Sequence, residues 1–270
     1  PADYAELSAS GFHADKAPEG SSKSLFLIIE SHNVAITGRG EINGSGPAFY
    51  DRSVSGRHYG KPARPRPRMV TAWRCCNLRF EGPSFADSPC WTFWLIRCRE
   101  ISFYRIRISG DPRMINHDGV DLDMCQDVTI SDSIIRTGDD CLVLRAIRQV
   151  SDQEEPCERI VVSNCILESA CQGIRIGCPS DGVIRQAVFT NLLITRSHNG
   201  ILMEFPHRYL ANGDRGSASI HDLNFSNISI ECRQHPIRLH VEPGISLGRI
   251  EQIAFSSVTA KGGSPCVIHG

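Results

Sequence analysis

Residues 116–144 read NHDGVDLDMCQDVTISDSIIRTGDDCLVL. This stretch holds two acidic clusters, Asp118/Asp121/Asp123 and Asp139/Asp140, on either side of a β-like run. If the chain makes one full coil between the clusters, Asp118 and Asp140 lie on neighbouring strands, and parallel strands are about 4.8 Å apart. Carboxyl groups placed in this way can divide an acid role and a base role between them.

Short apolar runs recur along the whole chain and predict such coils. Each run ends on an apolar anchor, and the steps between anchors range from 23 to 36 residues. Most anchors are followed by a second and a third short apolar run. Three short strands per irregular repeat are typical of an all-β solenoid of parallel strands. The anchors are Phe80, Phe103, Ile130, Val162, Phe189, Phe225 and Phe255.

The cysteines agree with this register. The residues five positions before the anchors are Cys75, Cys98, Cys125, Cys157, Ile184, Ile220 and Ile250. Cysteine and isoleucine at one repeat position predict a buried apolar stack rather than disulfides or a metal site. No paired CxxC spacing typical of zinc sites occurs among the twelve cysteines.

The third strand of each coil shows which side chains can form a cleft. Its inward positions are all apolar, and its outward row includes Trp94, Asp121 and Arg175. A polar row that includes Asp118, Asp140 and Gln172 precedes these strands, and we expect a binding cleft there. Asp is also a common turn former. Gly119 and Gly138 stand beside the aspartates and permit the unusual backbone angles that would turn Asp139 and Asp140 to one side.

Composition excludes several classes of protein. The 270 residues are 41% hydrophobic and 22% charged, with a formal net charge of −1. This balance does not favour nucleic acid or an anionic membrane surface, and no apolar run approaches the roughly 20 residues that span a bilayer. Segments 51–67, 151–156 and 206–219 are interpreted as loops inserted into the coils. We expect residues 1–270 to form one β-helix domain, truncated at one or both ends.

The two acidic motifs resemble those of a known enzyme family. Asn116-His-Asp-Gly-Val-Asp and Gly138-Asp-Asp-Cys resemble two motifs of the polygalacturonase-like glycoside hydrolases, glycoside hydrolase family 28, and residues 36–44 resemble its early coil. The resemblance implies a right-handed parallel β-helix that hydrolyses pectic polysaccharide with inversion. By position, Asp139 would be the general acid, and Asp118 and Asp140 would orient and deprotonate the water. A secreted or periplasmic location follows from the resemblance, because pectic polymers of the cell wall lie outside the cell.

Two departures from the family pattern concern the substrate. Gln172 stands in place of the histidine of the family's Gly-His-Gly motif, and Leu202-Met-Glu204 stands in place of Arg-Ile-Lys, which is thought to hold the substrate carboxylate. Either a neighbouring cation such as Arg175 replaces the lost ones, or the subsite takes a neutral sugar and Glu204 binds its hydroxyls. Arg145 lies by Asp123 and is expected to pair with it.

Asn116, Gln172, Arg175, Glu204, Arg145, Trp94 and Trp91 are the expected substrate-binding residues, with Trp94 the more exposed of the two tryptophans. We expect no metal, no cofactor, and no nucleic-acid or membrane partner, whereas the oligomeric state stays open. The rival functions are hydrolysis of a neutral or rhamnose-containing pectic substrate, a polysaccharide lyase, and a non-catalytic carbohydrate-binding β-helix.

Overall fold

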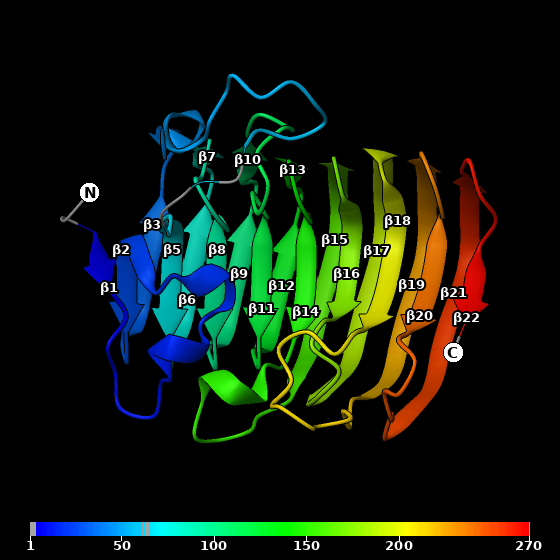
Figure 1. Cartoon of the computed structure of the whole chain (residues 1–270). Coiled ribbons are helices and arrows are strands. Elements are labelled where there is room, and N and C mark those ends of the chain that lie inside the picture. The colour runs from blue at the N-terminus through cyan, green and yellow to red at the C-terminus, as the bar shows by residue number, and fades with distance from the viewer. Residues whose placement is uncertain (1–3, 61, 63–64, 270) are drawn as a thin grey trace.

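The computed structural model describes residues 4–60, 62 and 65–269, and over these residues the chain is a stack of β-coils (Figure 1). Its helical content is limited to four short 3-10 turns, at Ala14–Lys16, Pro18–Gly20, Gly46–Phe49 and Arg148–Val150. In the described part of the chain, none of the helices has the length and apolar character needed to cross a bilayer. The predicted all-β solenoid is therefore confirmed.

Two long sheets run along the stack. The first has ten strands, all parallel except for the antiparallel pair β1–β2. Its order is β1 (Ala5–Glu6), β2 (Lys23–Ile29), β5 (Arg68–Trp73), β8 (Phe93–Ile96), β11 (Val120–Asp123), β14 (Leu142–Arg145), β16 (Gln172–Gly177), β18 (Asn199–Phe205), β20 (Ile237–Val241) and β22 (Val267–His269). Strands β8 to β20 of this sheet are the expected third strands, and they pair in the expected register.

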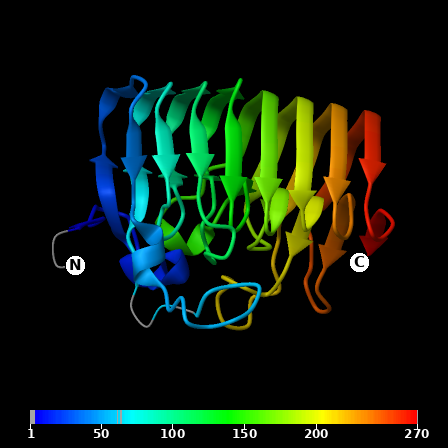
Figure 2. The same cartoon turned by 90° about the horizontal axis from the view of Figure 1, so that it is seen from above.

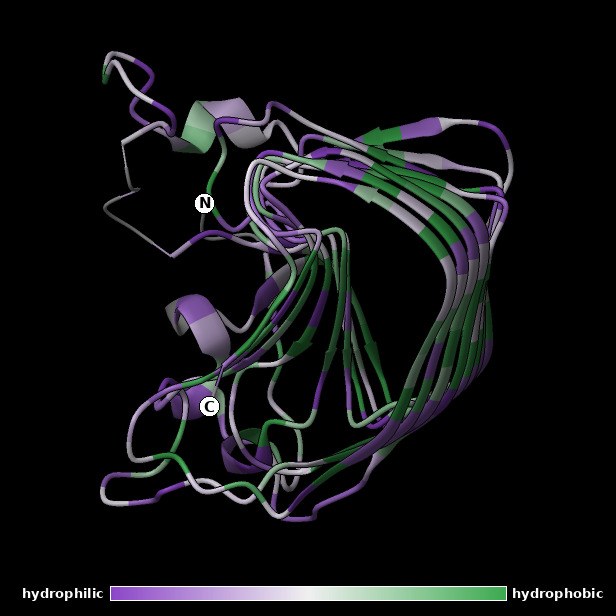
Figure 3. Ribbon diagram, turned by 90° about the vertical axis from the view of Figure 1, so that its right-hand side faces the viewer, coloured by the Kyte–Doolittle hydropathy of each residue, from purple (hydrophilic) through white to green (hydrophobic). Residues whose placement is uncertain are grey.

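The second sheet has twelve strands and wraps around the other side of the coil (Figures 2 and 3). In the early coils it consists of separate strands, and from β15 onward two runs merge into single long bent strands. The separate strands are β3 (His32–Thr37), β4 (Glu41–Asn43), β6 (Cys76–Glu81), β7 (Ser84–Ala86), β9 (Arg99–Tyr104), β10 (Arg107–Ser109), β12 (Gln126–Ser131) and β13 (Ile134–Thr137). The long strands are β15 (Cys157–Ser169), β17 (Val183–Ser197), β19 (Ser219–Cys232) and β21 (Arg249–Lys261).

The corners of the coil explain which residues begin the apolar runs. The first residue of each run, from Asn77 to Gln252, has a left-handed backbone with φ between 53° and 57°. A second left-handed corner carries a ladder in which the side-chain amide of Asn191 donates to Asn164 and that of Asn227 donates to Asn191, over 3.1 and 2.7 Å. Asn and Asp tolerate this backbone region better than most residues, so the corners favour them.

The interior of the coil is a continuous apolar core. Phe225 stacks on Phe189 and on Phe255 with ring centroids 4.9 and 4.8 Å apart. The predicted cysteine–isoleucine stack is confirmed, with Cys157 in register with Ile184. None of the twelve cysteines, all of which lie in the described ranges, forms a disulfide. Most of the stability therefore comes from burial of apolar side chains, rung against rung.

The outward face of strands β5, β8, β11 and β14 in the first sheet is also buried, which the sequence did not indicate. The N-terminal segment crosses the front of β5 and β8 (Figure 1), and Phe12 packs against Trp73 and Trp94 with ring centroids 5.1 and 6.0 Å apart. Trp94 is therefore fully buried, and the expectation that it is the more exposed tryptophan is wrong.

Candidate active site

The two acidic clusters do lie on adjacent coils. Val120 pairs with Leu142 in the parallel ladder between β11 and β14, and the backbone N–H of Gly119 donates to the carbonyl of Asp140 over 2.8 Å. A full coil therefore separates Asp118 from Asp140, as predicted.

Gly119 and Gly138 are needed because a side chain would clash with neighbouring loops, and not because their backbone requires a positive φ. Neither has a positive φ. A Cβ on Gly119 would lie 2.3 Å from the carbonyl oxygen of Cys141, and one on Gly138 would lie 2.2 Å from that of Met114. Any side chain would push these loops apart and separate the aspartates that they carry.

Asp139 is held by a set of backbone hydrogen bonds. Its Oδ2 accepts the backbone N–H of Asn116 over 2.9 Å. Its own N–H donates to the carbonyl of His117 over 3.1 Å, and the N–H of Gly138 donates to Nδ1 of that ring over 3.1 Å. The hydroxyls of Thr137 and Ser169 both donate to the carbonyl of Asp139. The loop therefore has one defined position, and the half-buried carboxylate points to the edge of the site.

Two arginines balance the other carboxylates. Arg175 donates to Oδ2 of Asp140 over 3.1 Å and also pairs with Glu204. Arg145 lies 2.8 Å from Asp121 and 4.0 Å from Asp118. One oxygen of Asp118, Oδ1, is buried without a hydrogen-bond partner among the described residues. A buried carboxylate oxygen without a partner is costly, so this atom is available to a water molecule or substrate.

The acids surround a cavity of about 30 Å³, which we call the acid cavity. This volume holds about one water molecule and is too small for a sugar ring. Glu19 pairs with Arg208, and the Tyr209 hydroxyl donates to Glu19 over 2.9 Å. These three residues complete the lining of the cavity. The lining residues are Glu19, Trp91, Asn116, Asp118, Asp139, Asp140, Arg145, Arg175, Cys178, Arg208 and Tyr209.

Burial and mutual repulsion shift the proton affinities of the cluster. Burial, and then the charge of Asp140, raise the pKa of Asp139 to about 6. Burial raises the pKa of Asp118 well above its usual value, and the neighbouring carboxylates of Asp139, Asp121 and Asp140 add to the shift. Burial raises the pKa of Asp121 to about 8 although Arg145 opposes the shift. A carboxyl group with a pKa of about 6, such as Asp139, is mostly protonated below that pH, as acid catalysis requires.

Several expected binding residues lie elsewhere. Gln172 is buried and accepts a hydrogen bond from Asn199 over 2.8 Å, and neither Gln172, Glu204 nor Trp94 lines the acid cavity. The pairing of Arg145 with Asp123 is corrected, because Asp123 instead accepts hydrogen bonds from the backbone of Ile147 and from Trp94. Arg145 instead pairs with Asp121, two residues earlier on β11.

One group of side chains at the site has the proximity expected of metal ligands. Oxygens of Asp139 and Asp140 and the sulfur of Cys171 lie within 4.8 Å of one another, the one set in the described residues with metal-ligand proximity. Asp140 is already paired with Arg175, so we assign no ion to this set.

Glu19, Arg208 and Tyr209 come from segments outside the repeat, so the periodicity of the sequence could not have located them at the site.

Comparisons with known proteins agree with the motifs. The sequence model of Glycosyl hydrolases family 28 matches residues 8–242. The chain belongs to this family. It is 25% identical over 223 residues to a probable polygalacturonase of Arabidopsis thaliana, covering 74% of this chain and 46% of that protein. It is 24% identical over 259 residues to polygalacturonase-2 of Solanum lycopersicum, covering 91% of this chain and 53% of that protein.

Solved structures confirm the architecture. A polygalacturonase from Erwinia carotovora superimposes with a TM-score of 0.70 at 15% identity, over 99% of this chain and 76% of that one. The fold is thus a right-handed parallel β-helix. The family 28 chain described here spans about half the length of the curated relatives it matches.

Proposed function

We propose that this family 28 chain is an inverting glycoside hydrolase that cleaves glycosidic bonds in a pectin-type polysaccharide. The observation that carries the proposal is the set of three carboxylates on adjacent coils, Asp118, Asp139 and Asp140, around a cavity with room for one water. Two of the three have raised pKa values for stated physical reasons. Hydrolysis with inversion needs an acid, a base and a water held between them and the sugar.

Asp139 is assigned as the general acid. It is half-buried at the edge of the acid cavity, its pKa is about 6, and its loop is fixed by hydrogen bonds. Protonated Asp139 would donate to the leaving oxygen while Asp118 and Asp140 hold and deprotonate the water. Oxygens of Asp139 and Asp140 approach within 4.8 Å, closer than the roughly 6.5–9.5 Å between acid and base in inverting enzymes generally. For that reason Asp140 is not assigned as the base on its own.

A second candidate substrate is a neutral or rhamnose-containing pectic polymer. It is favoured by the pairing of Arg175 with both Asp140 and Glu204, which leaves this arginine engaged before any substrate arrives. Among the expected binding residues, Asn116, Trp91, Arg145 and Arg175 line the acid cavity, and we propose them as contacts for sugar or water.

The lyase and the binding-only alternatives are less favoured by family membership. Because the relevant polymers lie outside cells, we also propose a secreted or periplasmic location. The test is a product assay on galacturonan, rhamnogalacturonan and neutral pectin side chains. New reducing ends with inverted anomeric configuration by NMR support the proposal. Ultraviolet-absorbing unsaturated products would point to a lyase, and no product from any of the polymers would reject catalysis.

A further inference from the structure

A groove of about 250 Å³ lies beside the acid cavity and is rich in arginine. Its floor includes Thr137 and Ser169, whose hydroxyls donate to the carbonyl of Asp139. The groove therefore lies directly behind the loop that carries the general acid. We call it the arginine groove, and it is lined by Arg136, Arg196 and Arg233 with Glu168.

The positive charge of this groove is only partly neutralised. Arg136 and Arg196 share Glu168 over 3.3 and 2.9 Å, so that one carboxylate serves two guanidinium groups. Arg233 and the exposed Arg57 both donate to the carbonyl of Ala170. Within the described ranges neither of these two arginines has a carboxylate within 4.0 Å.

Two guanidinium groups on one carbonyl oxygen repel each other. Burial lowers the pKa of Arg233, and the charge of Arg57 lowers it further. The pKa of His198 is lowered by burial and then by the charges of Arg57 and Arg233. An anion placed between these groups would remove the repulsion, and planar guanidinium groups bind carboxylates with two parallel hydrogen bonds.

The acid cavity offers no such partner for an anion. Arg145 faces Asp121, Arg175 faces Asp140 and Glu204, and Arg208 faces Glu19. A substrate carboxylate placed there would meet the charge of three aspartates. The charges of the arginine groove therefore favour a charged sugar unit, whereas those around the acid cavity disfavour one beside it.

We propose that Arg57 and Arg233, at the rim of the arginine groove, bind the carboxylate of a uronic acid unit that neighbours the cleaved bond. The inference rests on the proposed function for its substrate class. It replaces the cations missing at Leu202 and Glu204 with Arg57 from an inserted loop and Arg233 from the end of β19, and it leaves the unit beside the acid cavity free to be neutral.

Binding is tested in the Asp139→Asn background, which prevents turnover, by calorimetry with an oligogalacturonide and with its methyl ester. Arg57→Gln/Arg233→Gln should weaken binding of the charged ligand about fivefold or more, and binding of the ester much less. Exposed ion pairs contribute up to about 1 kcal/mol each, and 1.4 kcal/mol is a factor of ten. Arg57→Lys/Arg233→Lys should restore part of the affinity if charge is responsible.

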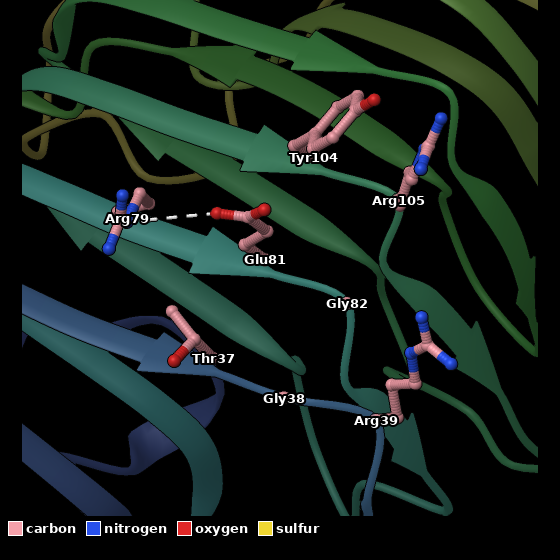
Figure 4. Close-up of a pocket in the computed structure, with 8 residues that line it drawn as sticks. All are labelled: Thr37, Gly38, Arg39, Arg79, Glu81, Gly82, Tyr104 and Arg105. Carbon is pink, nitrogen blue, oxygen red and sulfur yellow. Dashed lines mark ion pairs between the residues drawn. The ribbon is translucent and has the colours of Figure 1, made fainter.

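The matched control is Arg39→Gln/Arg105→Gln. These exposed arginines point toward another hollow, of about 370 Å³, whose lining includes no residue of the acidic loops (Figure 4). The proposal is overturned if Arg57→Gln/Arg233→Gln and the Asp139→Asn protein that carries neither change bind the charged ligand equally. It is also overturned if the Asp139→Asn protein does not bind this ligand at all. If the ligand binds in a charge-dependent way but the wild-type protein does not hydrolyse it, the carboxylate subsite is supported and the proposed hydrolase is rejected. If the wild-type protein hydrolyses the polymer but binding does not depend on Arg57 and Arg233, the hydrolase is supported and the subsite is rejected.

Discussion

Arg175 donates to the carboxylate of Asp140 over 3.1 Å and pairs at the same time with Glu204. One guanidinium group on β16 thus joins the loop before β14 to the strand β18. Its charge also lowers the pKa of Asp139, against the larger raising effects of burial and Asp140. Arg175 therefore regulates the proton affinity of the proposed acid without touching it.

Replacing Arg175 should move the pH profile. In Arg175→Gln the cation that favours ionised Asp139 is gone, so the pKa of Asp139 rises above about 6 and the acid stays protonated to higher pH. The basic limb of kcat against pH should shift upward, even if kcat itself falls. Glu204→Gln is the control, because it removes a partner of Arg175 and leaves the cation in place. An unchanged or lowered limb in Arg175→Gln would contradict this account.

His117 should act as a positioning residue for Asp139. Burial lowers the pKa of His117 to about 4, so the ring is neutral in most assays and its Nδ1 can accept the N–H of Gly138. His117→Phe leaves that N–H unpaired, which costs about 1–3 kcal/mol of stability. It should lower kcat about tenfold with little change in KM, because a small misplacement of a catalytic group is costly.

The conservative variant separates this role from simple packing. His117→Asn supplies a side-chain acceptor near the position of Nδ1 and should retain much more of the wild-type kcat than His117→Phe. If the two variants lose kcat equally, or if KM carries the whole effect, the hydrogen bond to Gly138 does not position the acid.

Glu19 should fasten the loop over the acid cavity. The Glu19 carboxylate is only 8% exposed, and Glu19→Gln removes its ion pair with Arg208. We expect a loss of about 1 kcal/mol, a Tm lower by about 2–4 °C, and faster tryptic cleavage after Arg208. Glu30→Gln is a matched control, since Glu30 also has a positive φ and pairs with an arginine, Arg74, on an exposed surface. Equal cleavage rates in both variants would show that the Glu19 contact does not hold the loop.

The sequence predicted the coils better than it predicted their surroundings. Apolar rows such as Cys157/Ile184 and Phe189/Phe225 repeat because each rung packs on the last, so spacing alone located them. The same logic placed Asp118 beside Asp140. Periodicity says which way a side chain faces but not what covers it, so Trp94 was expected outside and is buried.

Contacts between residues outside the repeat could not be predicted from the sequence either. Glu19 comes from the weakly patterned N-terminal segment and Arg208 from an inserted loop, and they meet 189 residues apart in the chain. Arg145 was expected to pair with Asp123, its neighbour in the ladder. Asp123 is already occupied by the backbone N–H of Ile147 and by Trp94, and Arg145 pairs with Asp121, on the same strand as Asp123, a choice that strand spacing does not reveal.

Stability should fall as pH rises through the acid cluster. Asp139 and Asp123 have pKa values of about 6 and Asp121 of about 8, against about 3.9 for an unfolded Asp. The folded state therefore binds more protons between pH 4 and 8, and the free energy of unfolding declines across that window. His117 opposes this trend below about pH 6.5, because its folded pKa is lowered.

Asp139→Asn should flatten this decline by removing one of the raised groups. Because Asp139 is partly exposed, the gain at pH 8 relative to wild type should be about 1–2 kcal/mol, less than the two-unit shift alone implies. Thermal unfolding at pH 5 and pH 8 measures it. A variant that is less stable than wild type at pH 8 would show that Asp139 is not under electrostatic strain.

The central claim is that Asp139 acts as the acid in hydrolysis by this cluster, and kcat of Asp139→Asn measures it most directly. Release of reducing ends should fall about 100-fold or more. Asp132→Asn, an exposed aspartate at a left-handed corner that tolerates Asn, should match the wild type. Turnover by Asp139→Asn within threefold of wild type, with the fold intact by circular dichroism, would contradict the account.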